Sequence, residues 1–152
     1  MSSEVITELS IRKVVDVFYE RVRKDVVLGP VFESHLAGKW DTHLPRMYAF
    51  WTKALLGTGD FQGNVFGKHM ALSSIEKEHF VRWLTLFRMT SIEIFGAETA
   101  QPMLAVAQRI ASSLQLGLFG VRYSDFSGHS CLVKFTNRSL YEDIEKDVHP
   151  RT

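Results

Sequence analysis

The chain has 152 residues, of which 45% are hydrophobic and 23% charged, so it is long enough to bury a core as one globular domain. The formal net charge is only +1, which argues against a nucleic-acid partner, because phosphate binding draws on clustered positive charge. The single cysteine, Cys131, excludes an intrachain disulfide and a multi-cysteine metal site, and it suits a reducing compartment.

No targeting or membrane segment is expected. Residues 1–4 are polar and lack a basic segment followed by an apolar core, and no stretch approaches the roughly 18 to 20 apolar residues of a membrane span. We therefore expect a soluble cytoplasmic protein. Aromatic residues make up 12% of the chain, with eleven Phe and three Trp. Either a packed core or a flat aromatic cofactor with apolar walls explains this share.

The first helix is expected from Ser10, its N-cap, to the Leu28-Gly29-Pro30 segment, which should stop it because proline lacks the backbone N–H. Apolar residues recur along it at helical spacing. They are Ile11, Val14, Val15, Phe18 and Val22. Charged residues fill the opposite face, so this helix should bury one side.

A second helix is expected from Asp41 to Gly57, with Pro45 in its first turn, where a missing N–H costs little. Residues 60–74 show weak periodicity and should form a loop with one helical turn around Gly67 to Met70. A third helix should span residues 74–95, with Gly96 as its stop, and a fourth residues 97–118.

The sequence therefore predicts an all-α fold with four substantial helices in one bundle, because no alternating strand pattern appears before residue 120. Residues 121–152 look different. They begin turn-like, include a short extended piece at residues 131–135, and end in an acidic stretch that suits a short helix. This segment could dock on the bundle or stay mobile.

Three familiar kinds of site have little support. The glycine-rich segment from Gly57 to Gly63 follows a helix rather than a strand and lacks the Gly-Lys-Ser/Thr that grips phosphate, so we expect only a turn. None of the six histidines forms a His-Glu-x-x-His pair, which argues against zinc. No Gly-x-Ser-x-Gly elbow appears, which argues against Ser-His-Asp chemistry.

One histidine lies in a setting compatible with haem. His69 falls near the short turn between the second and third expected helices. Five further residues lie on or beside apolar faces, namely Tyr19, Phe32, His43, Met47 and Trp83. From periodicity alone, however, a plain aromatic core is the better account of these residues.

Several segments occur in an order and at spacings that are specific as a set. They are Phe18-Tyr19-Glu20-Arg21-Val22-Arg23-Lys24-Asp25, Leu28-Gly29-Pro30-Val31-Phe32, Trp40-Asp41-Thr42-His43-Leu44, Phe50-Trp51, Leu56-Gly57-Thr58-Gly59-Asp60-Phe61-Gln62-Gly63, Lys68-His69, and Phe80-Val81-Arg82-Trp83-Leu84-Thr85-Leu86-Phe87. Through them, residues 7 to 120 or so resemble the group III truncated haemoglobins, a bacterial family whose fold is a two-over-two helical sandwich around haem. The glycine pairs of groups I and II are missing, which fits group III. The segment after residue 120 has no counterpart.

The resemblance implies haem b as the cofactor, with His69 in the place of the proximal histidine that bonds iron. A neutral imidazole is the usual axial donor for ferrous haem. Phe32 matches the phenylalanine that wedges the haem. Arg46 and Lys68 are the candidates to reach the haem propionates, on position and charge alone.

On the distal side, the resemblance implies that Tyr19 matches the distal tyrosine of the family and that Trp83 matches its distal tryptophan. Both side chains can donate hydrogen bonds, which suits a ligand such as dioxygen that gains negative charge when bound. His43 matches the residue that gates this side, and Met47 lies one turn further along. His43 could donate to the ligand, swing outward to open a path, or act as an acid toward peroxide.

Three functions are open at this point. The first is a haem protein that binds dioxygen and turns over nitric oxide to nitrate or peroxide to water, with a reductase as electron donor. The second is a module that stores or senses dioxygen or another diatomic ligand without turnover. The third is a helical interaction protein without haem. We expect residues 1–120 to form the truncated globin domain and residues 121–152 a C-terminal extension of unknown role.

Overall fold

The computed structural model describes residues 4–63, 65–70, 72 and 74–120, and among these no residue lies in a strand. The helices are α1 (Glu8–Lys24), α2 (Leu28–Leu36), α3 (Trp40–Leu56), α4 (Val65–Met70), α5 (Lys77–Phe95) and α6 (Ala97–Phe119). The prediction of an all-α fold is confirmed. Cys131 and the elements expected after residue 120 lie outside the described residues.

The chain divides into two compact units. The first unit holds the residues up to Phe61 together with Ile75–Ala107, and the second holds Gln62–Ser74 and the residues from Gln108 onward. Helices α1, α2, α3 and α5 therefore belong to the first unit, and α4 belongs to the second. None of the described helices combines the length and apolar character that crossing a bilayer requires.

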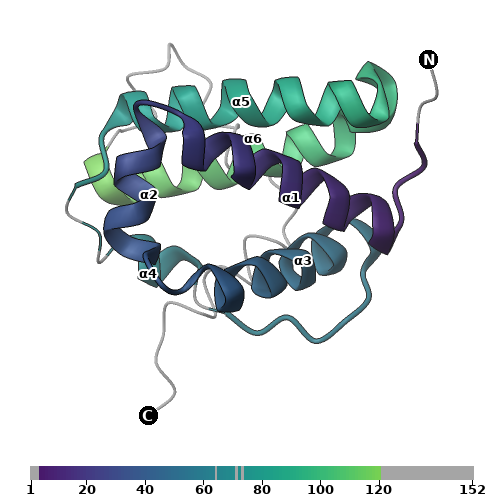
Figure 1. The fold of residues 1–152 in the computed structure, drawn as a ribbon, viewed down its shortest axis with the longest axis horizontal. Helices are drawn as coiled ribbons and strands as arrows, with labels where there is room; N and C mark the ends of the chain where they lie inside the picture. The colour runs from purple at the N-terminus through teal and green to yellow at the C-terminus, as the bar shows by residue number, and fades with distance from the viewer. Residues whose placement is uncertain (1–3, 64, 71, 73, 121–152) are drawn as a thin grey trace. The chain divides into compact units, whose positions relative to one another are not determined.

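Helix α1 provides much of the core of the first unit. It contacts α2, α3 and α5, and Figure 1 shows it running between α3 and α5. The stripe predicted from its sequence is buried. Its members are Ile11, Val14, Val15, Phe18 and Val22, each at most 1% exposed. Burying a side chain of this size is worth roughly 1.5 to 3 kcal/mol, so this stripe is a main source of stability for the unit.

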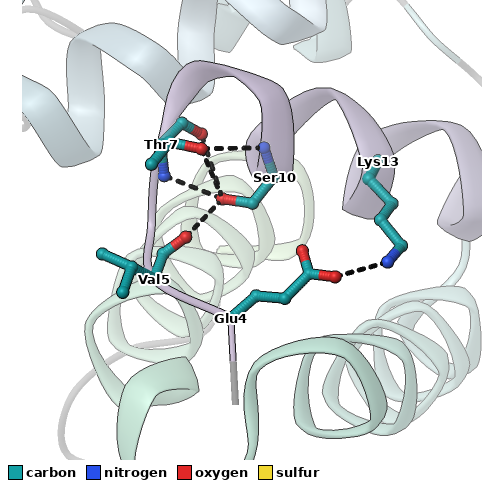
Figure 2. Close-up of polar contacts among 5 residues, drawn as sticks. All are labelled: Glu4, Val5, Thr7, Ser10 and Lys13. Atoms are coloured by element: carbon teal, nitrogen blue, oxygen red, sulfur yellow. Dashed lines mark hydrogen bonds and ion pairs between the residues drawn. The ribbon is translucent and has the colours of Figure 1, made fainter. Parts of the chain in front are cut away.

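The start of α1 is fixed by a reciprocal pair of hydrogen bonds between Thr7 and Ser10 (Figure 2). The backbone N–H of Ser10 donates to Oγ1 of Thr7 at 3.1 Å, and the backbone N–H of Thr7 donates to Oγ of Ser10 at 2.7 Å. Thr7 is therefore the N-cap, and the prediction that Ser10 is the cap was wrong. Ser10 is the third residue of the helix, and its side chain completes a capping box with Thr7.

Helix α2 was not predicted, because Leu28-Gly29-Pro30, expected only to stop a helix, begins the next one. The Asp25 carboxylate accepts from the backbone N–H groups of Val27, at 3.1 Å, and Leu28, at 2.9 Å. Pro30 is the third residue of α2, where a backbone N–H has no partner within the helix, so proline costs no hydrogen bond there.

Gly29 is required because α2 approaches the backbone of α1 closely. A Cβ at this position would lie 2.7 Å from the carbonyl oxygen of Arg23, which is closer than real Cβ atoms come to backbone. Glycine thus allows the two helices to meet directly.

The ends of α3, α5 and α6 lie within one residue of the predicted ones, but two other predictions about these helices were wrong. Pro45 is the sixth residue of α3 rather than part of its first turn, so the carbonyl of Asp41 has no N–H to accept there. Helix α5 begins at Lys77 rather than at residue 74, with Glu76 as its N-cap residue, and the Glu76 N–H donates to Nδ1 of His79 at 3.0 Å. The expected single helical turn is α4.

An ion pair ties the end of α1 to α5. The Arg82 guanidinium donates from Nε to Oδ2 of Asp25 at 2.7 Å and from Nη2 to Oδ1 at 2.8 Å. The hydrogen bonds from Arg82, as the largest cause, and the two backbone N–H donors lower the pKa of Asp25 to about 2, although burial opposes this shift. The folded state therefore favours the ionised carboxylate.

We expect the Asp25→Asn variant to be less stable at neutral pH by about 1 to 2 kcal/mol, a value reduced by the solvent screening of Arg82, whose side chain is 45% exposed. Because folding lowers the pKa of Asp25, its contribution is fully present above about pH 4 and is lost as the pH falls toward 2. Urea unfolding followed by circular dichroism at several pH values should show the difference between the two chains shrinking across that interval. A difference that does not change with pH would refute this account.

Candidate functional site

An aromatic cluster forms where α1, α2 and α3 meet in the first unit. We call its four members Tyr19, Phe32, Trp40 and His43 the Tyr19 cluster. The ring centroid of Tyr19 lies 5.4 Å from that of His43 and 6.0 Å from that of Phe32, with the rings edge-on. Three residues that the sequence analysis assigned to one site, on three different helices, therefore lie together.

Trp40 contacts every other member of the Tyr19 cluster. Its ring centroid lies 5.8 Å from both Tyr19 and His43, edge-on, and it is stacked with Phe32 at 6.4 Å. Trp40 was not predicted to be a site residue. Its position three residues before His43 on the same helix was the available signal, because residues at this spacing share a helix face.

Trp83 lies beside the Tyr19 cluster, with Phe18 between its ring and that of Tyr19. The Phe18 ring lies 5.0 Å from the Tyr19 ring and 5.7 Å from the Trp83 ring, edge-on in both cases. Trp83 is also stacked on Phe87 at 5.4 Å, and Phe87 is stacked on Trp51 at 5.1 Å. The half-buried indole of Trp83 is thus held in place by rings on two sides.

Burial sets the protonation state of Tyr19. The residue is only 7% exposed, and burial raises the pKa of its phenol well above the ordinary value of 10. The phenolate is disfavoured because a buried charge loses the stabilisation that solvation by water provides. Tyr19 therefore keeps its proton at neutral pH and is available as a hydrogen-bond donor.

Helix α3 carries three of the predicted residues. His43 and Met47 are half-buried and share a face because they lie four residues apart, and Nε2 of His43 is buried. Arg46 is exposed on the same helix. The helix thus presents its apolar side toward the interior and a positive charge toward solvent.

Helix α4, in the second unit, carries His69 and Lys68. The ring Nδ1 of His69 lies 2.7 Å from the carbonyl oxygen of Val65, four residues earlier. Since a carbonyl can only accept, Nδ1 is the protonated nitrogen and Nε2 carries the lone pair. Burial lowers the pKa of His69, the bond to Val65 opposing it, so the ring is neutral at pH 7. Lys68, next to it, is exposed.

A solvent-open hollow of about 450 Å³ lies between α1 and α3. Its lining consists of Asp16, Tyr19, Glu20, Arg23, Lys24, Trp40 and Leu44. Two members of the Tyr19 cluster thus form part of a surface that solvent reaches. Within the part of the chain that the structure describes, no three His, Cys, Asp or Glu side chains gather into a group that could hold a bare metal ion.

Comparison with known proteins shows similarity to a curated protein and to a solved structure, both from Campylobacter jejuni. No protein-family model matches the chain. The chain is 37% identical over 122 residues to the group 3 truncated hemoglobin ctb of Campylobacter jejuni, covering 78% of this chain and 96% of that protein. It also resembles the crystal structure of a group III truncated hemoglobin from Campylobacter jejuni, with a TM-score of 0.74, 37% identity and coverage of 78% and 96% of the two chains. Its motifs and its all-α fold are consistent with these similarities. The chain therefore belongs to the group III truncated haemoglobins.

Proposed function

We propose that this chain binds haem b through Nε2 of His69 and holds dioxygen or another diatomic ligand beside Tyr19, Trp83 and His43. The observation that carries the proposal is the hydrogen bond from His69 to the Val65 carbonyl. Family membership supports it, because the similar Campylobacter protein is named a hemoglobin.

The chemistry of His69 fits haem iron. Iron requires a neutral imidazole with one unprotonated nitrogen, and the bond to Val65 assigns the proton to Nδ1 and the lone pair to Nε2. The same bond orients the ring and increases the basicity of Nε2. Burial, by lowering the pKa of His69, preserves this state at neutral pH.

When bound, haem supplies an iron that takes up diatomic molecules and passes negative charge to dioxygen. We assign to the Tyr19 hydroxyl and the Trp83 indole N–H the role of donating to that charge. Tyr19 remains protonated because of its burial, and tryptophan can act only as a donor. Phe32 and Met47 exclude water, which strengthens such hydrogen bonds.

Two peripheral assignments complete the binding site. Arg46 and Lys68 are exposed, positively charged residues on α3 and α4, and we assign them to the haem propionates. We also propose that residues 1–120 form the globin domain and that residues 121–152 are an extension. The length of the similarity, 122 residues covering 96% of the Campylobacter protein, supports this division.

The ligand is proposed to be consumed as well as held. Conversion of dioxygen and nitric oxide to nitrate requires one electron per turnover, so a cytoplasmic reductase is part of this proposal. Reduction of peroxide to two molecules of water requires two electrons, which the same reductase would supply, and two protons. His43, a titratable group that contacts Tyr19, is the proposed proton donor. The second candidate is a binding or sensing module without turnover, which the same donors would serve.

Visible spectroscopy tests the proposal directly. We expect the purified full chain to show a Soret band, or to acquire one when haem is added, and to give a spectral change with dioxygen after reduction. A chain that acquires no Soret band would refute haem binding. Rapid mixing of the dioxygen-bound form with nitric oxide then separates the two candidates, since stoichiometric oxidation indicates turnover and slow, incomplete oxidation indicates a binding module.

A further inference from the structure

The side chain of Trp40 is held from outside the Tyr19 cluster. Its indole N–H donates to Oε1 of Glu33 at 2.9 Å, and the same oxygen accepts from Nε of Arg23 at 3.0 Å. The Arg23 guanidinium carbon also lies 4.7 Å from the centre of the Trp40 ring. Trp40 is therefore bonded at its edge and covered on its face by groups from α2 and α1.

The Glu33 carboxylate satisfies the indole N–H of Trp40, which is only 6% exposed and can only donate. A buried indole N–H needs an acceptor, and a carboxylate is a strong one. Arg23 and Glu33 are both well exposed, so their ion pair alone contributes little stability. Its main effect is to fix the carboxylate oxygen that the indole requires.

The rings of the Tyr19 cluster depend on where Trp40 lies. Trp40 contacts Tyr19 and His43 edge-on and is stacked with Phe32, so a rotation of the indole would change its contact with each. Trp40 and Tyr19 both line the hollow between α1 and α3, where solvent has access. A displaced indole would therefore loosen Tyr19 and expose it to water.

We propose that Trp40 is a positioning residue for ligand binding, held by Glu33 and Arg23, and that it fixes the orientation of Tyr19 and His43 toward the ligand. This inference rests on the proposed function. It adds three residues that do not themselves meet the ligand, and it assigns a use to an exposed ion pair.

Dioxygen dissociation from the reduced, haem-bound protein tests the proposal. We expect Glu33→Ala and Trp40→Phe each to speed dissociation about fivefold, the loss expected when one hydrogen bond is made less well. The double variant should be no faster than either single variant, because both remove the same interaction. Glu33→Gln should restore most of the original rate, because its amide oxygen can accept from the indole.

The matched control is Glu93→Ala, which removes an interhelical ion pair of the same kind, with Arg21 at 2.8 Å, outside the Tyr19 cluster. It should change the rate less than twofold, whatever it does to the melting temperature. A Glu33→Ala rate equal to that of the unchanged protein, or additive effects in the double variant, would overturn the proposal.

Proton NMR of the carbon monoxide form supplies a readout other than ligand loss. The Trp40 indole signal, assigned by its disappearance in Trp40→Phe, should move upfield in Glu33→Ala and stay in place in Glu93→Ala. An unmoved signal in Glu33→Ala contradicts the hold on Trp40. Failure to take up haem at all contradicts the proposed function itself, whereas normal haem binding with unchanged rates contradicts only the role of Trp40.

Discussion

Replacing His69 with alanine is expected to abolish stable haem binding. The change removes the one ring nitrogen that the bond to Val65 leaves available as an axial donor. Loss of a group that merely supports a metal ligand weakens metal affinity about 10- to 100-fold, so loss of the ligand should cost at least about 100-fold. Titration of the variant with haem, followed at the Soret band, measures this change.

Added imidazole distinguishes loss of the ligand from loss of the fold. If His69 serves as the axial donor, millimolar imidazole should restore much of the Soret band in His69→Ala, because a free imidazole can occupy the space left by the side chain. The variant should also keep the far-ultraviolet circular dichroism of the unchanged chain. A five-coordinate ferrous spectrum in His69→Ala without imidazole would show that another residue bonds the iron.

The second large effect is expected for Tyr19→Phe, which should speed dioxygen dissociation by about 10- to 100-fold. A hydrogen bond to a charged acceptor is worth roughly 1.5 to 3 kcal/mol, and each 1.4 kcal/mol is a factor of ten in rate. Phenylalanine keeps the ring contacts with His43 and Phe32, so the change removes only the donor. Stopped-flow displacement of dioxygen by carbon monoxide measures the rate.

Tyr48→Phe is the matched control for this experiment. Tyr48 lies on α3 and donates its hydroxyl to Asp16 on α1, so the variant loses the same atom from a different place. Its dioxygen dissociation rate should equal that of the unchanged protein. Equal rates in Tyr19→Phe and the unchanged chain would remove Tyr19 from the ligand site.

The sequence predicted helices well where apolar residues repeat at helical spacing. It predicted them less well where glycine and proline, which commonly end a helix, occur at the start of one. The stripe from Ile11 to Val22 is buried as expected. Gly57 and Gly96 end α3 and α5 with positive φ, 70° and 84°, which glycine adopts without strain. Helix α2 was missed because Gly29 and Pro30 are typical of a stop, whereas here they permit a close contact and occupy a first turn.

The residues of the candidate site could be predicted from the sequence, but the contacts that hold them in place could not. Tyr19, Phe32 and His43 were selected from motif order, and they lie in one cluster. The contacts that hold Trp40 could not be inferred from spacing, because its partners Glu33 and Arg23 lie on two other helices and meet it only after folding. Contacts of this kind depend on how helices cross, which periodicity along one helix does not encode.

The close contact between Gly29 and the carbonyl of Arg23 fixes the angle at which α2 packs against α1. Phe32 and Glu33 lie three and four residues beyond that point, about 4.5 and 6 Å along the helix axis. A methyl group at position 29 would force α2 to tilt away from α1. The tilt would displace the Phe32 ring and the Glu33 carboxylate that holds Trp40 at the same time. The geometry around Tyr19 is therefore set partly by a residue that has no side chain.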